Sequence, residues 1–366
     1  MKSLCKKLFC LFLILVMVTA LTVNTFSLGI TSDSGSYSQD SSSYDQYVLK
    51  CLPDLFSLLS SDADKYGLSD TELESISVSS SFTISGTQNN EKYYALMSGN
   101  EVLGIITVSY TGGKFYLTYA KDFADNLNQL YTSRASFSLS WEHNDNEPSS
   151  LVVQSSTNLE ASISTSLSNK LVSNVSANSN LTTSSATRST NDSGELTGTF
   201  PLIFQNYPVY NCSCSVACAK AMAQYFDSSL SSKSLGDVIY EVYGWQEIPC
   251  APYFLPLSRA TEVFDEYVSN SYLTFNYGLT LQGMKNQINS NNPTMCIAES
   301  PDDEDSYHST VITGYSYGSQ SSSYMIDMMD PYTPSWRVVF WDGTGELSYS
   351  FNGYQKVWRK TIVLYS

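Results

Sequence analysis

A long polar stretch divides the chain of 366 residues into two parts. Residues 155–198 consist mainly of Ser, Thr and Asn, and no aromatic residue occurs again before Phe200. A segment of this composition cannot bury enough apolar surface to form a core, and a structureless loop of this length is uncommon inside a compact domain. We therefore predict a linker at 155–198, with a folded region on each side of it.

The first residues of the chain predict export from the cell. Lys2, Lys6 and Lys7 precede an apolar run from Leu8 to Leu21. That run is shorter than the roughly 20 residues of a membrane-spanning helix and has the form of a secretory signal. We expect residues 1–28 to be a signal peptide, which leaves a secreted, extracellular protein without a membrane association.

The charge of the chain excludes one class of partner. Its formal net charge is −16, and charged residues make up only 15% of the sequence. Nucleic-acid binding requires patches of Lys and Arg that neutralise phosphates, and the sequence contains no such patch. We therefore expect no nucleic-acid partner, and the sequence does not indicate an oligomeric state.

The region 29–154 has the pattern of a small α+β module. Apolar residues recur at helical spacing between Tyr44 and Tyr66, and Pro53 suggests that this helix starts near the proline. Further along, we predict strands at 93–97, 102–110 and 114–119 and a short helix at 120–130. Gly-containing turns separate these strands, as expected for a meander.

In the region 199–366, the sequence pattern predicts helices first and an antiparallel sheet after them. This order of elements is typical of an α+β fold. We expect helices at 214–226, 235–243, 257–267 and 280–289, the last one capped by Thr280. We expect strands at 294–298, 307–315, 323–329, 336–341 and 357–365.

Three residues in this second region follow the order of a thiol-based catalytic site. Cys214 stands at the start of a predicted helix, His308 begins an apolar strand, and Asp330 ends the next strand before a proline. Cys, His and Asp can act as nucleophile, base and orienting group. The chain has only two histidines, and His143 lies in a polar segment where we expect it to be solvated.

Several short motifs resemble those of papain-like cysteine peptidases, specifically the branch related to bacteriocin-leader peptidases. The string Cys214-Ser215-Val216-Ala217-Cys218 is similar to the C-W-A-A-C of that branch, and the run from His308 to Tyr315 is similar to its H-x-x-V-x-x-G-Y strand. Asp330-Pro331 matches the third member. The resemblance implies a peptidase domain at 199–366 preceded by a propeptide at 29–154. It also implies that the enzyme is made as a zymogen and acts on peptide or protein substrates.

By the same resemblance, Cys214 is the nucleophile, His308 the base and Asp330 the orienting acid. Gln205 is the candidate oxyanion donor, although nine residues before Cys214 is a longer spacing than usual. Cys212 is the alternative candidate for the nucleophile. Asp327 competes with Asp330, and because the two are three apart on a strand they should face opposite sides.

Other interpretations stay open from the sequence. A catalytically silent papain-like module that binds peptides, and a transglutaminase-like acyl-transfer enzyme, both fit the same residues. We assign Cys218, Cys250 and Cys296 to packing, and we expect no cofactor and no metal, because no C-x-x-C pair and no paired histidines occur. The acidic run 302–305 could bind calcium but is more typical of a solvated loop.

Overall fold

The structure is a computed structural model that describes residues 41–79, 81–84, 87, 91–99, 101–133, 137–144, 147–155, 192–205, 213–244, 257–301, 303–332 and 335–366. Residues from Asp40 onward form one compact unit, and only this unit is considered below. The predicted signal peptide, most of the predicted linker, Cys212 and Cys250 lie outside the described residues. No helix among the described residues is long and apolar enough to cross a membrane.

The N-terminal part of this unit is a helix packed on a four-stranded meander. Helix α2 (Ser41–Ser61) is followed by α3 (Asp70–Glu74), β1 (Ile76–Val78), β2 (Glu91–Ser98), β3 (Glu101–Thr111), β4 (Lys114–Ala120) and α4 (Ala124–Ser133). The expected turns are confirmed, with Gly99, Gly112 and Gly113 at positive φ, a conformation that glycine adopts at little cost. These residues therefore fold as the α+β meander that their pattern predicts.

Our prediction that the first helix starts near Pro53 is wrong. Helix α2 begins at Ser41 and continues through Pro53 to Ser61. A proline inside a helix costs about 3 kcal/mol, because it removes one hydrogen bond and crowds the preceding turn. Val48, Leu52 and Leu55 are buried on both sides of the proline, and this packing offsets the local cost.

The C-terminal part begins with helices, as its pattern predicts. They are α6 (Cys214–Phe226), η1 (Ser228–Ser232), α7 (Leu235–Tyr243), α8 (Leu257–Ala260), α9 (Glu262–Tyr267) and α10 (Leu281–Asn289). The Thr280 cap is confirmed, because its hydroxyl accepts from the Gly283 N–H. Helix α6 is buried from Cys214 to Ala223, so it forms the centre of the helical layer.

The strands of the C-terminal part continue the same sheet. They are β7 (Ser193–Glu195), β8 (Tyr272–Phe275), β9 (Thr294–Ser300), β10 (Asp303–Gly318), β11 (Ser323–Asp330), β12 (Ser335–Trp341), β13 (Ser348–Phe351) and β14 (Tyr354–Leu364). The strand order is β1-β2-β3-β4-β12-β11-β10-β9-β14-β13, with β7 beside β10 and β8 beside β14, and the pairings are antiparallel. Mixed helices and one large antiparallel sheet make this an α+β fold, as expected.

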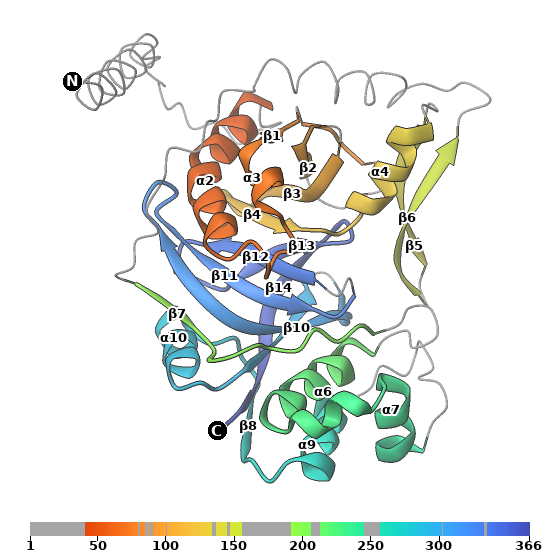
Figure 1. Ribbon diagram of the computed structural model, residues 1–366, viewed down its shortest axis with the longest axis vertical. Coiled ribbons are helices and arrows are strands. Elements are labelled where there is room, and N and C mark those ends of the chain that lie inside the picture. Colours follow the sequence, from red (N-terminus) through yellow and green to blue (C-terminus); the bar gives the residue numbers. More distant parts are fainter. Residues whose placement is uncertain are drawn as a thin grey trace. The chain divides into compact units, whose positions relative to one another are not determined.

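The N-terminal meander and the C-terminal strands meet in one hydrogen-bonded ladder. Strand β4 pairs with β12, with Tyr119 opposite Val338 and Leu117 opposite Phe340. Figure 1 shows α2 and β1–β4 beside the blue strands, and α6, α7 and α9 on the other side of those strands. Two regions that we expected to be separate modules along the chain therefore share a sheet in space.

Three strands lie in segments for which we predicted none. Strands β5 (Phe137–Asn144) and β6 (Glu147–Ser155) form a two-stranded sheet of their own. Strand β7 falls inside the segment that we predicted to be a linker, yet it pairs with β10, and Leu196 after it is buried in the core. The end of the predicted linker thus takes part in the fold.

Candidate active site

Cys214 occupies the first position of helix α6. Its side chain is buried, with 6% of its surface exposed, and the helix behind it is buried as far as Ala223. The N-terminus of a helix carries a partial positive charge, which favours a thiolate over a thiol. The fold therefore places this sulfur where a negative charge is stabilised.

Strand β10 docks on the first turn of α6 through its backbone. The Ser309 carbonyl accepts from the Cys218 thiol at 3.3 Å, and Ser309 is close enough to the Cys214 sulfur to help lower the pKa of that thiol. The two cysteines are four residues apart and therefore face the same strand. This contact fixes the distance between the helix and the residue that precedes Ser309, which is His308.

His308 lies between a sulfur and a carboxylate. Its Nε2 is 2.9 Å from Oδ1 of Asp330, and the nearby Cys214 thiol contributes to the raised pKa of the imidazole. Its ring stacks on Phe351 with the centroids 3.7 Å apart and the planes at 8°. With 2% of its surface exposed, the imidazole is held in one orientation by contacts on its edge and its face.

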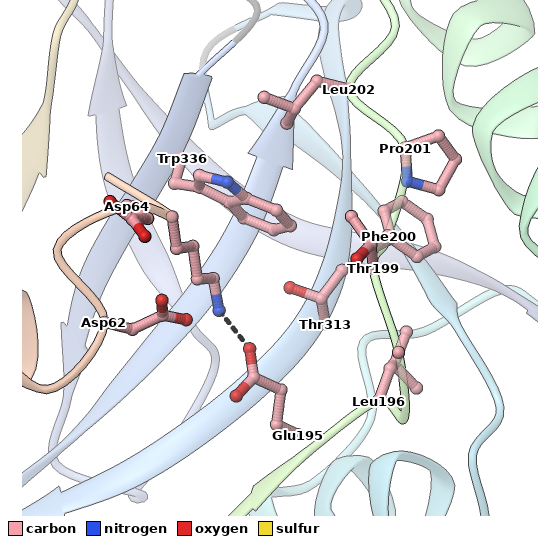
Figure 2. Close-up of a pocket in the computed structure, with 12 residues that line it drawn as sticks. Asp62, Asp64, Glu195, Leu196, Thr199, Phe200, Pro201, Leu202, Thr313 and Trp336 are labelled. Carbon is pink, nitrogen blue, oxygen red and sulfur yellow. Dashed lines mark hydrogen bonds and ion pairs between the residues drawn. The ribbon is translucent and has the colours of Figure 1, made fainter. Parts of the chain in front are cut away.

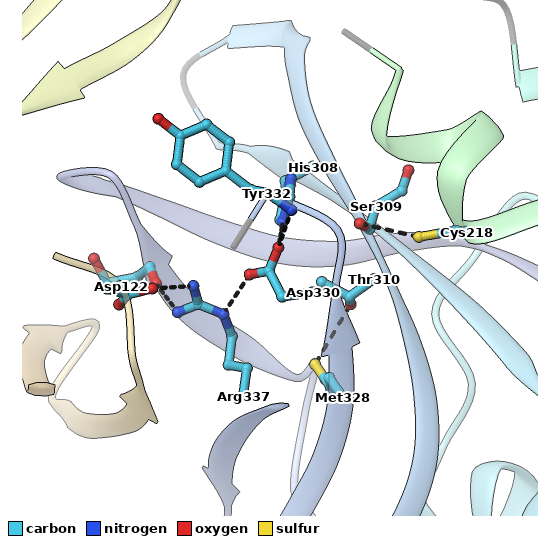
Figure 3. Close-up of polar contacts among 10 residues, drawn as sticks. Asp122, Cys218, His308, Ser309, Thr310, Met328, Asp330, Tyr332 and Arg337 are labelled. Carbon is cyan, nitrogen blue, oxygen red and sulfur yellow. Dashed lines mark hydrogen bonds and ion pairs between the residues drawn. The ribbon is translucent and has the colours of Figure 1, made fainter. Parts of the chain in front are cut away.

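Asp330 is the carboxylate that reaches His308, and Asp327 is not. Asp330 ends β11 and is fully buried, where it accepts from His308, from the Tyr332 N–H at 3.0 Å and from Nε of Arg337 at 2.8 Å (Figure 3). Asp327 faces the other side of the sheet, where it accepts from the Tyr66 hydroxyl at 2.7 Å and from Lys65 at 3.2 Å. The two carboxylates therefore lie on opposite faces, as strand alternation predicts.

The charges of this group reinforce one another. Burial opposes ionisation of the Cys214 thiol, but its hydrogen bond with His308 and the charge of that imidazole hold its pKa below the ordinary value. Burial also opposes the charged form of His308, yet the neighbouring Asp330 raises the pKa of the imidazole. The pKa of Asp330 is lowered despite its burial, because His308 and Arg337 are both cationic. The arrangement favours a thiolate–imidazolium pair.

Gln205 lies next to both ends of this group. Its backbone N–H donates to the carbonyl of Pro331, directly after Asp330, at 2.9 Å. Its own carbonyl accepts from the hydroxyl of Ser213, directly before Cys214, at 3.2 Å. The side chain is 3% exposed, and its Oε1 has no hydrogen-bond partner among the described residues. The structure thus brings Gln205 to the site despite its long spacing from Cys214.

The other described cysteines are core residues. Cys51, Cys218 and Cys296 are fully buried, and with Cys214 they are free of disulfide bonds. Burial, the largest cause, raises the pKa of the Cys218 thiol well above its ordinary value and also raises that of Cys296. These thiols therefore stay neutral. Cys212 and Cys250 lie outside the described residues, so the choice between Cys212 and Cys214 as nucleophile stays a prediction.

Three residues of the site were not predicted from the sequence. Phe351 stacks on the imidazole, Arg337 binds Asp330, and Asp122 binds Arg337 at 2.6 Å (Figure 3). Arg337 had a signal, because a charged residue inside the apolar run 336–341 needs a buried partner. Asp122 had none, because its role depends on the pairing of β4 with β12.

A separate cavity of about 570 Å³ lies on the opposite face of the sheet from Arg337. Figure 2 shows Trp336 and Glu195 among the side chains that line it, and Glu195 forms an ion pair with Lys65. It is lined by Asp62, Asp64, Lys65, Glu195, Leu196, Gly198, Thr199, Phe200, Pro201, Leu202, Thr313 and Trp336. Because Trp336 and Arg337 are adjacent on a strand, they face opposite sides, and none of Cys214, His308 and Asp330 lines this cavity.

Among the residues that the structure describes, no group of three or more His, Cys, Asp and Glu residues is suitable for a metal ion. His143 lies in β5, and the acidic run 302–305 overlaps the start of β10, but the side chains of both lie outside the described part. The calcium interpretation of the acidic run therefore stays open.

Comparison with known proteins points in the same direction as the geometry. Residues 197–362 match the Peptidase_C39 like family. The match contains Cys214, His308, Asp330 and Gln205, and it supports a cysteine-type peptidase of the bacteriocin-processing branch. No curated protein matches the chain.

The lowered pKa of Cys214 predicts an unusual alkylation profile. A free thiol, with a pKa of about 8.5, reacts with iodoacetamide ever more slowly as pH falls below that value. Because the pKa of Cys214 is lowered, its alkylation rate should stay high to a lower pH and fall only below the lowered pKa. The rate of each cysteine is measured by mass spectrometry between pH 4 and 9.

The control for that experiment is His308→Ala, which removes the positive partner of the thiolate. We expect its Cys214 profile to move toward higher pH, whereas Cys218 and Cys296 stay unreactive in the folded protein of either form. An identical Cys214 profile in the two proteins would mean that His308 does not stabilise the thiolate.

Proposed function

We propose that this protein is a secreted, papain-like cysteine peptidase that hydrolyses peptide bonds with Cys214, His308 and Asp330. The observation that carries the proposal is the buried group of Cys214, His308 and Asp330, in which the imidazole hydrogen-bonds to the Asp330 carboxylate and lowers the pKa of the Cys214 thiol. A helix that begins at the cysteine, next to an antiparallel sheet that holds the histidine and the acid, has the arrangement expected of a papain-like domain. The match at 197–362 supports the same class of enzyme.

The proposed reaction proceeds in two acyl-transfer steps. The Cys214 thiolate attacks the carbonyl carbon of a peptide bond, and the electron pair of the C=O bond moves to its oxygen. His308, as imidazolium, donates its proton to the leaving amine when the C–N bond breaks, which leaves a thioester on Cys214. Water then attacks the thioester while His308 takes its proton, and the C–S bond breaks, which releases the carboxylic acid product and restores the Cys214 thiolate beside the imidazolium. Asp330 keeps the imidazole in one orientation and stabilises its positive charge throughout.

Gln205 is the proposed donor to the oxyanion of the tetrahedral intermediate. Its backbone is fixed to Pro331 on one side and to Ser213 on the other, so its side chain starts close to the helix end that carries the sulfur. A pre-oriented amide stabilises charge that develops in the transition state without reorganising at that moment. The chemistry proposed here needs no metal and no cofactor.

Two other functions use the same residues and differ in their products. A silent binding module would bind peptides without cutting them. A transglutaminase-like enzyme would pass the acyl group from Cys214 to an amine instead of water, which lengthens or crosslinks peptides. We favour hydrolysis because the family match is to a peptidase. The acidic net charge of −16 agrees with a protein substrate rather than a nucleic acid.

The roles of Cys214 and His308 predict a simple mutational result. Cys214→Ala and His308→Ala should each reduce peptide cleavage to background, a loss on the order of 10⁶ in kcat, because each member of such a unit is essential. Cys218→Ala, on the same helix face one turn later, is the matched control and should retain cleavage. Initial rates on a fluorogenic peptide, with mass analysis of the products, provide the measurement.

The same experiment distinguishes the alternatives. Retained cleavage in Cys214→Ala, with loss in Cys212→Ala, would move the nucleophile to Cys212. A folded wild-type protein that cuts no peptide but binds one would favour the silent module, and amine-linked products would favour the transglutaminase-like enzyme.

The role of Gln205 predicts a different kinetic signature. Gln205→Ala should lower kcat by on the order of 10²–10³ while leaving KM little changed, because an oxyanion donor acts mainly on the transition state. Gln224→Ala, which removes a side chain that accepts from Lys220 at 2.7 Å on α6, is a control that should keep normal kcat. An unchanged kcat in Gln205→Ala would show that the oxyanion donor lies elsewhere.

We also propose that the enzyme is made as a zymogen in which residues 29–154 restrain the peptidase until the linker at 155–198 is cut. The compact N-terminal meander and the polar stretch after it support this, because exposed polar segments are the preferred sites of proteolysis. Since β4 pairs with β12, the N-terminal meander should stay bound after the cut.

Cutting the linker of purified protein with a limiting amount of trypsin, which can act at Lys170 or Arg188, tests this proposal. Peptidase activity should rise as the intact chain disappears, and both fragments should elute together in gel filtration. The control is Lys170→Gln/Arg188→Gln, which removes both sites. Equal activity before and after the cut would instead favour a permanent targeting or adhesion role for the N-terminal region.

A further inference from the structure

One buried cation stands between the candidate active site and the N-terminal meander. Arg337 has 1% of its side chain exposed. Its Nε donates to Oδ2 of Asp330 at 2.8 Å, its Nη2 donates to Oδ1 of Asp122 at 2.6 Å, and its Nη1 reaches the Ser350 carbonyl at 3.4 Å. Figure 3 shows the guanidinium between the two carboxylates, with His308 on the far side of Asp330.

The charges explain why two carboxylates are present. Asp330 faces two cations, Arg337 and the imidazolium form of His308, and it is fully buried. A buried arginine with a single anionic partner would draw on the same carboxylate that must stabilise the imidazolium. The second anion, Asp122, satisfies the other end of the guanidinium. Asp330 is then left to serve His308.

The backbone at Asp122 is built to bring this carboxylate to Arg337. Asp122 follows β4, the strand that pairs with β12, and Arg337 precedes Val338, which lies opposite Tyr119. Its φ of 35° lies in the left-handed region, which a residue with a side chain occupies at a cost of about 1–3 kcal/mol. The surrounding structure therefore enforces this conformation, as is common where a side chain must reach a particular partner.

A second contact from the same meander supports the other side of the imidazole. Glu91, at the start of β2, is buried and accepts from the Ser350 hydroxyl at 2.6 Å. Ser350 also presents its carbonyl to Arg337, and the next residue, Phe351, is the ring that stacks on His308. The N-terminal meander thus contacts both the acid and the aromatic support of the imidazole through one intermediate residue each.

We propose that Asp122 is a positioning residue for the Asp330–His308 pair, acting through Arg337, and that the N-terminal meander is a lasting part of the active enzyme. The proposal rests on the peptidase function proposed above. Asp122 touches neither substrate nor sulfur in it. Its task is to hold Arg337 so that the acid keeps both its orientation and its negative charge for the imidazole.

The direction of the expected effect follows from the groups that face one another. His308 faces Asp330 and Cys214 and also interacts with the charge of Asp122, and Arg337 faces Asp122, Asp330 and the ring of Tyr349. Asp122→Asn removes one negative charge from this set and leaves Arg337 with Asp330 alone. The imidazolium is then less stabilised, so the alkaline limb of the activity profile, where His308 loses its proton, should move to lower pH.

The experiment uses the full chain and compares wild type, Asp122→Asn and Asp54→Asn. Asp54 is a matched control, since it is an aspartate of the N-terminal part with an intramolecular partner and accepts from the backbone N–H of Ser321 at 2.6 Å, away from the site. We expect kcat/KM of Asp122→Asn to fall on the order of tenfold, with its alkaline limb at lower pH. Asp54→Asn should keep the wild-type pH profile even if its unfolding midpoint drops.

If Asp122→Asn folds poorly, a second comparison still tests the proposal. Arg337→Met removes the cation, so adding Asp122→Asn to it should change the alkaline limb little, because Asp122 acts through Arg337. Two results would overturn the proposal. One is an alkaline limb at the wild-type pH in folded Asp122→Asn, and the other is a large shift of that limb when Asp122→Asn is added to Arg337→Met.

Alkylation of Cys214 distinguishes this failure from failure of the peptidase function. If wild-type protein shows neither peptide cleavage nor a His308-dependent Cys214 profile, the proposed function is wrong. If wild type shows both and Asp122→Asn matches it at every pH, only the positioning role of Asp122 is wrong.

Discussion

The Asp330 carboxylate is the interaction on which the candidate site depends. Within the fully buried end of β11 it accepts from an imidazole, a guanidinium and a backbone N–H. A buried carboxylate is costly unless its hydrogen bonds and charges are satisfied, and here both oxygens are used. The same contacts that make its burial tolerable also fix the direction of the His308 ring. Structural stability and the proposed chemistry thus share one group.

The pairing of β4 with β12 explains why a distant part of the chain reaches this group. The ladder places the end of β4, and with it Asp122, beside the strand that carries Arg337. Lys65 and Tyr66 bind Asp327 on the other face of β11. The N-terminal part therefore supplies polar partners to β11 directly on one face and, through Arg337, supports Asp330 on the other. A simple cover over a cleft would require no such contacts within the core of the sheet.

Local pattern was sufficient to predict most of the elements and the opposite faces of Asp327 and Asp330. Helix α7 lies at the predicted residues, Thr280 caps α10, and the alternation of β11 separates Asp327 from Asp330. These features depend on neighbours within a few positions along the chain. Helix α2 was misplaced because long-range packing of its apolar face overrides the local cost of Pro53. Strand β7 was missed because its pairing with β10, rather than its own composition, makes it a strand.

The role of Asp122 could not be predicted from local sequence pattern. The sequence around it is Ala120-Lys121-Asp122-Phe123, which reads as an ordinary polar turn between a strand and a helix. Its significance depends on a register between strands more than 200 positions apart, and a shift of one residue would turn Arg337 to the opposite face. Arg337, in contrast, lies in an apolar strand, and a charged residue at such a position indicates a buried partner. A charged residue within a buried strand is therefore a useful starting point for finding partners that local pattern cannot reveal.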